Sequence, residues 1–311
     1  MDTHETPTTP DAFPIPPGLP SLERPERLLW WQGALAMLGM IPMLIVANVA
    51  AALVSVAVGS GTEGLAQLQG NTEALVSFPL VAAGQAANLI VFVTIAVLAP
   101  FLARVPHRTA LGLGGAPVSV FALGAVGILG LSPLADRIVR ELTVYFPDQS
   151  ALEMIERAVK GQPLWSLVPV LAVIPAVGEE LLCRGVLQRS LRSPWVALPV
   201  SAVFFAALHM DPLHMAGVLP LGFFLAWLGQ RTNSVWVPIA AHFTNNLAAT
   251  LSLFASESLT PEEAELPLYA IPVGLLVTLV CSVGIHFVMR WQASPTPPAP
   301  PRDASLAEGS P

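Results

Sequence analysis

The chain has 311 residues, of which 54% are hydrophobic and only 11% are charged, and its formal net charge is −7. A soluble globular protein carries about 25% charged residues. These values exclude an ordinary soluble enzyme, a nucleic-acid-binding protein and a disordered protein, and they indicate an integral membrane protein.

Eight stretches without Asp, Glu, Lys or Arg are each at least 18 residues long. A helix needs roughly 20 residues to cross the hydrocarbon core of a bilayer, so each stretch is a candidate span. The sequence therefore predicts an all-α, polytopic transmembrane bundle of about eight helices. In chain order the stretches are 28–62, 74–103, 109–135, 161–178, 193–210, 212–230, 232–256 and 266–289.

Proline-rich tails at 1–27 and 292–311 flank the predicted transmembrane bundle at 28–291, and we expect both tails to be disordered. The longest polar insertion inside the bundle is 136–160. Its second half, from Gln149, predicts an amphipathic surface helix. The apolar face of that helix would be formed by Ala151, Met154, Ile155 and Ala158.

The basic residues predict an orientation for a multi-pass protein of the cell membrane. Eight spans place both tails on one side, and nine of the fourteen basic residues fall on that side. The positive-inside rule assigns this side to the cytoplasm. The insertion 136–160 has four basic residues on the opposite side, so either this insertion is an exception to the rule or a neighbouring span is wrongly assigned.

The first unusual polar cluster contains Glu179, Glu180 and Arg184, at the end of the fourth apolar stretch. A charge at mid-bilayer costs about 2.5–3.5 kcal/mol, so such residues are functional candidates. Glu180 and Arg184 are four residues apart and can form an ion pair on one helix face, whereas Glu179 lies on another face. The alternative is a helix end whose charges are simply solvated.

Two further clusters lie on the fifth and seventh stretches. Phe205 and His209 are one helical turn apart, as are His242 and Asn246. Each pair could instead be structural, because a buried histidine or asparagine can be satisfied by hydrogen bonds between helices. His214, in the short loop after His209, is expected to be solvated.

Together these residues suggest peptide-bond hydrolysis. Packed helices can bury one carboxylate, two imidazoles and one amide in a small wet cavity. The carboxylate of Glu179 would act as general base on a water held with the help of an imidazole. The second imidazole and the amide would donate to the developing oxyanion.

The three motifs resemble those of the CPBP intramembrane proteases, the family of type II CAAX prenyl proteases and their bacteriocin-related bacterial relatives. The matching patterns are Glu-Glu-x-x-x-Arg at 179–184, Phe-x-x-x-His at 205–209 and His-x-x-x-Asn at 242–246, within a protease core at 164–255. The resemblance implies a peptidase in which Glu179 activates water, His209 positions it, and His242 and Asn246 stabilise the oxyanion. It implies supporting roles for Glu180, Arg184 and Phe205, and a peptide or lipidated protein as substrate.

Three questions stay open at this level. Family members are called metalloproteases, and Zn²⁺ could be held by Glu179, His209 and His242, although a metal-free mechanism needs the same residues. A transporter or a non-catalytic scaffold of the same fold are the alternatives to an enzyme. If each span begins directly after its flanking charges, Glu179 and His209 would also lie at different depths, unless the fourth span starts later, the fifth span begins deeper, or the fourth helix continues beyond the membrane to Leu191.

Overall fold

The computed structural model describes residues 26–67, 77–146, 151–256 and 266–292, without the side chains of 59–67 and 151–154. The tails predicted at 1–27 and 292–311 lie almost wholly outside the described residues. The described elements are α1 (Trp30–Gln67), α2 (Phe78–Ala103), α3 (His107–Ala110), α4 (Val118–Leu129), α5 (Ser132–Thr143), α6 (Ala151–Val159), α7 (Leu164–Leu167), the π-helical η2 (Val168–Val173), α8 (Ile174–Glu180), the π-helical η3 (Leu181–Leu187), α9 (Gln188–Ser190), α10 (Pro194–Ala207), α11 (Pro212–Thr232), α12 (Trp236–Ser256) and α13 (Ala270–Gln292).

The predicted helical membrane bundle is confirmed. Within the described residues, six helices are long and apolar enough to cross a membrane. They are Trp30–Val58, Phe78–Ala103, Val118–Thr143, Leu164–Ser190, Pro212–Thr232 and Ala270–Gln292.

The expected number of eight spans is higher than the six that meet these criteria. The stretches 193–210 and 232–256 also contain helices, but α10 has only 14 residues, or ~21 Å of helix. Helix α12 carries His242, Asn245 and Asn246 in its middle, so it is less apolar than the six. The third span begins at Val118 and not at 109, because a glycine-containing loop and Pro117 precede it.

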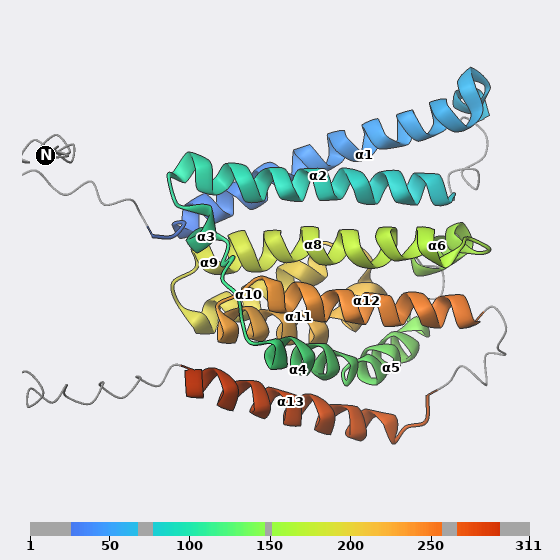
Figure 1. Cartoon of the computed structure of the whole chain (residues 1–311). Helices are drawn as coiled ribbons and strands as arrows, with labels where there is room; N and C mark the ends of the chain where they lie inside the picture. Colours follow the sequence, from blue (N-terminus) through green and yellow to red (C-terminus); the bar gives the residue numbers. More distant parts are fainter. Residues whose placement is uncertain (1–25, 68–76, 147–150, 257–265, 293–311) are drawn as a thin grey trace, which may run out of the picture.

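The helices lie side by side, and α1 begins at the same end of the bundle at which α13 finishes (Figure 1). We call this the basic end, because Arg104, Arg189, Arg231 and Arg290 lie at helix ends there. The opposite end carries α6, and we call it the α6 end. The predicted amphipathic helix of the polar insertion is confirmed as α6, in which Ala158 is buried and the described charged residues are exposed.

The segment Leu164–Ser190 is one long helix with two π-helical stretches, and it lies between α2 and α12 (Figure 1). Its buried residues belong to both hydrophobic clusters of the bundle, since Leu182 and Val186 pack toward α1 and α2 and Cys183 packs toward α11 and α12. Because the helix continues to Ser190, Glu179 lies ~16 Å from its basic end, and His209 lies ~20 Å along from the start of α10. The expected difference in depth is therefore reduced to roughly 4–6 Å.

Helices α10 and α11 pack closely against each other at Gly222 of α11. A Cβ atom at Gly222 would lie 3.0 Å from the Phe205 ring and 3.1 Å from the carbonyl oxygen of Ala202. The absence of a side chain at Gly222 thus allows α10, which carries Phe205, to lie close to α11.

We expect Gly222→Ala to lower the free energy of unfolding by about 1–3 kcal/mol, because the added methyl group must displace backbone or an aromatic ring. Gly39→Ala is the matched control, since nothing lies within 4 Å of its Cβ position, and it should be neutral or stabilising. Chemical denaturation of the purified variants in detergent measures both. Equal effects at the two glycines would contradict the proposed close packing.

Candidate active site

A cavity of about 260 Å³ lies within the bundle, and the predicted site residues converge on it. Glu179 of α8, His209 after α10, and His242 and Asn246 of α12 all line it. Phe205, the packing residue of the second motif, lines it as well. Three motifs separated by up to 67 positions in the chain therefore meet in one chamber.

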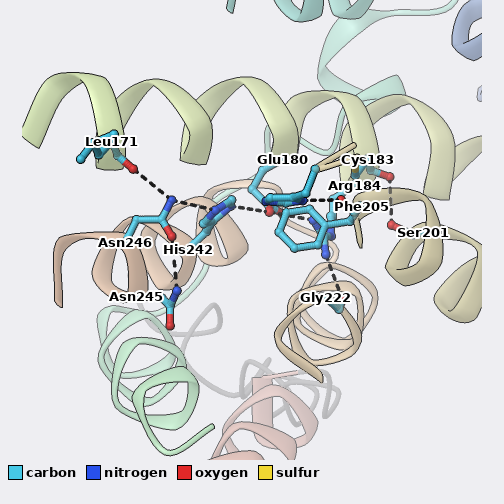
Figure 2. A network of polar contacts seen from close by, with 11 residues as sticks. Leu171, Glu180, Cys183, Arg184, Ser201, Phe205, Gly222, His242, Asn245 and Asn246 are labelled. Carbon is cyan, nitrogen blue, oxygen red and sulfur yellow. Dashed lines mark hydrogen bonds and ion pairs between the residues drawn. The ribbon is translucent and has the colours of Figure 1, made fainter. Parts of the chain in front are cut away.

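The two neighbouring carboxylates have different environments. Glu180 is fully buried, and its Oε1 accepts hydrogen bonds from Arg184 Nη1 at 2.7 Å and from His242 Nδ1 at 2.9 Å (Figure 2). Glu179 is half-buried, and no hydrogen bond to its side chain is found among the described residues, whereas Glu180 is bonded through Oε1 and has only its buried Oε2 without a partner. Glu180 is thus held by hydrogen bonds to Arg184 and His242, whereas Glu179 lines the cavity and can accept a proton from a water molecule there.

His242 connects Glu180 to Asn246. Its Nδ1–H donates to the Glu180 carboxylate, so the neutral ring has its acceptor at Nε2. Asn246 Nδ2 lies 3.1 Å from this Nε2 and 3.3 Å from the carbonyl oxygen of Leu171 (Figure 2). Two acceptors around one amide nitrogen fix the orientation of the Asn246 side chain.

The Leu171 carbonyl can accept from Asn246 for a reason that is local to the sequence. In an α-helix it would bond the N–H of residue 175, but Pro175 has no N–H. The backbone there adopts the π-helical stretch η2, in which the N–H of Ile174 bonds the carbonyl of Pro169. π-Helical turns of this kind occur frequently at functional sites.

Phe205 contacts both histidines at the wall of the cavity. Its ring, which is 2% exposed, makes edge contacts with His209 and His242, each at a centroid distance of 5.3 Å. The guanidinium carbon of Arg184 lies 4.6 Å from the centre of the same ring. Arg184 also donates from Nη2 to the carbonyl of Gly222 (Figure 2). These contacts hold both histidines and the arginine against one rigid group.

His209 and His214 are brought together by the turn between α10 and α11. Met210, three residues after the end of α10, has a positive φ of 52°, and the Asp211 carboxylate caps α11 by accepting from the His214 backbone N–H at 2.7 Å. His209 Nδ1 lies 3.1 Å from the Phe205 carbonyl, which makes Nδ1 the donor and leaves Nε2 as an acceptor. The ring of His214 lies 4.3 Å from that of His209 and lines the cavity, so the expectation of a merely solvated His214 is wrong.

Sequence reasoning missed other polar residues of the cavity wall. Asn245 donates to Asn246 Oδ1 at 3.3 Å and accepts from Ser132 Oγ at 3.5 Å. Gln85 of α2 also lines the cavity. An amide in an otherwise apolar span is the signal that could have identified Gln85.

The residues do not form the zinc site considered from the sequence. No group of three His, Cys, Asp or Glu side chains among the described residues is arranged to hold a metal ion. His242 in addition has both ring nitrogens engaged, by Glu180 and by Asn246. Glu179, His209 and His242 therefore share a cavity without forming a ligand set.

Comparison with known proteins supports the resemblance inferred from the motifs. Residues 161–248 match the family described as "Type II CAAX prenyl endopeptidase Rce1-like". An 83-residue part of the chain is 30% identical to a Bacillus subtilis (strain 168) protein called "Putative membrane peptidase YdiL". That match covers 26% of this chain and 34% of the relative. No solved structure matches the chain significantly.

Proposed function

We propose that this protein is a membrane endopeptidase that uses a water molecule activated by Glu179, because residues 161–248 match the type II CAAX prenyl endopeptidase family and part of the chain is similar to a protein called a putative membrane peptidase. The observation that carries the proposal is the shared cavity. There, a glutamate with an unpartnered buried oxygen faces His209, His242 and Asn246. The substrate would be a peptide segment of a membrane-associated protein.

In the proposed reaction, Glu179 removes a proton from a water molecule in the cavity, and the water oxygen attacks the carbonyl carbon of the scissile bond. His209 accepts a hydrogen bond from that water at Nε2, because its Nδ1 is held by the Phe205 carbonyl. Glu179 then returns the proton to the leaving amine as the C–N bond breaks. The products are a carboxylate and an amine, and no covalent enzyme intermediate forms.

Asn246 is suited to bind the oxyanion. Its contact with the Leu171 carbonyl is long, at 3.3 Å, and can be exchanged for a shorter bond to a developing negative charge. His242 accepts the other N–H of the amide and is itself held by Glu180. In this arrangement His242 positions Asn246 and does not itself donate to the oxyanion.

We expect Asn246→Ala to lower kcat about 10²–10³-fold with little change in KM, because it removes a donor used mainly in the transition state. Asn48→Ala is a matched control, since Asn48 is also an intramembrane asparagine but pairs with Asn88 between α1 and α2. Hydrolysis of a pool of quenched fluorogenic peptides by the purified proteins provides the comparison. A normal kcat for Asn246→Ala would remove Asn246 from the proposed oxyanion site.

We further propose that hydrolysis needs no metal ion, because His242 has no unengaged nitrogen and the three candidate ligands are not gathered. Turnover should be unchanged after incubation with EDTA or 1,10-phenanthroline. Metal analysis of the purified active protein should find less than one equivalent of zinc. Loss of activity in chelator that added Zn²⁺ restores would contradict this part of the proposal.

A further inference from the structure

The cavity is closed toward the basic end of the bundle. Its lining residues nearest to that end are buried: Leu225 is 1% exposed, Phe205 2% and His242 4%. Immediately beyond them lie the ion-paired Glu180 and Arg184, which are 0% and 1% exposed. In the part of the chain that the structure describes, this buried layer therefore separates Glu179 from the basic end.

A second cavity of about 230 Å³ begins on the other side of that layer. It is lined by Arg189, Arg192, Gln188 and the stem of Arg184, and it shares no lining residue with the first cavity. The cavity at the basic end therefore extends as far as Arg184 and does not reach Glu179.

The wall of the cavity is less buried toward the α6 end. The lining residues on that side, which are Gln85, Leu171, His214 and Leu253, are partly exposed, and Ala249 is exposed. Ile155 of α6 also contributes to the wall. Because α6 lies at the end opposite to the start of α1 (Figure 1), the less buried part of the wall lies away from the basic end.

The charges relate these two ends to the two sides of a membrane. Seven described arginines flank helices at the basic end: Arg27, Arg104, Arg108, Arg189, Arg192, Arg231 and Arg290. The α6 end carries four basic residues, Arg137, Arg140, Arg157 and Lys160, and the first two are paired within their own helix with Glu141 and Asp136. The positive-inside rule therefore places the basic end in the cytoplasm.

From these observations, and resting on the proposed function, we propose that the active-site cavity opens to the extracytoplasmic side. Its substrate would be a peptide segment that has reached that side of the membrane, such as the juxtamembrane part of an exported or membrane-anchored polypeptide. A prenylated C-terminus made in the cytoplasm would meet the closed basic end. The proposed substrate therefore differs from the prenylated proteins named in the description of the matching family.

The orientation can be tested without any substrate. Lys160→Cys places a thiol at the α6 end and Arg192→Cys places one at the basic end, and both positions are exposed. The two native cysteines are buried, so the parent protein gives the background. In intact cells, a membrane-impermeant maleimide should label Lys160→Cys at least 10-fold more than Arg192→Cys. The reverse pattern would overturn the proposal.

Access to the site is tested with the same pool of fluorogenic peptides, together with a farnesylated CAAX peptide. Right-side-out vesicles should cleave externally added peptides, whereas sealed inverted vesicles should show at least 10-fold less cleavage until detergent opens them. Cleavage confined to inverted vesicles, or a marked preference for the farnesylated peptide, would overturn the inference while leaving the peptidase in place. If detergent-solubilised protein cleaved nothing, the proposed function would fail, and thiol labelling would still decide the orientation.

Discussion

Replacing Glu179 by glutamine is expected to lower kcat about 10²–10⁴-fold, the range typical of a lost general base. Glutamine has nearly the same shape but cannot take a proton from water. Since no hydrogen bond or ion pair joins the Glu179 side chain to the rest of the described chain, folding should be unaffected. Peptide hydrolysis and thermal unfolding of the purified variant measure the two properties separately.

Glu180→Gln is the matched control for this experiment. It makes the same replacement of one carboxylate oxygen by an amide nitrogen in the neighbouring residue. Glu180, however, binds Arg184 and His242 in a fully buried site. We expect a clear loss of stability in Glu180→Gln and none in Glu179→Gln. If Glu179→Gln were as active as the parent protein, a scaffold or transporter of the same fold would become the better account.

Replacing Arg184 by methionine is expected to cost about 3–5 kcal/mol of unfolding free energy, because it leaves the Glu180 carboxylate buried without its cationic partner. It also removes the hydrogen bond to the Gly222 carbonyl and the contact with the Phe205 ring. The substitution should therefore also change the distance between α10 and α11. Chemical denaturation in detergent micelles measures the loss.

Arg140→Met is the appropriate control for Arg184→Met. Arg140 and Asp136 have the same four-residue spacing and a similar distance of 2.8 Å, but their side chains are 41% and 43% exposed. Exposed pairs of this kind contribute about 0–1 kcal/mol. Similar losses for the two variants would show that burial does not make the Glu180–Arg184 pair essential.

The sequence predicted the fold class and the convergence of the three motifs, because both depend on strong local patterns. Apolar stretches of spanning length define the helices. Polar groups inside such stretches must find partners, so Glu179, His209, His242 and Asn246 were expected together. Their common cavity follows from that requirement.

Other features depend on contacts between helices that spacing alone does not reveal. Sequence spacing pairs Glu180 with Arg184 four residues later and does not reveal its second partner, His242, on another helix. The acceptor role of the Leu171 carbonyl depends on Pro175, which has no N–H to bond it, and on the approach of Asn246 from α12. The place of His214 depends on the left-handed turn at Met210, which folds the start of α11 back over His209.

The most direct test of the proposed site is an experimental structure of the Glu179→Gln protein with a bound peptide from the fluorogenic pool. We predict that the scissile carbonyl lies in the cavity between α8, α10 and α12, with its oxygen within hydrogen-bonding distance of the Asn246 amide. A water molecule should lie between the carbonyl carbon and the side chain at position 179. A peptide bound on the lipid-facing surface or in the arginine-lined cavity at the basic end would contradict the proposed active site.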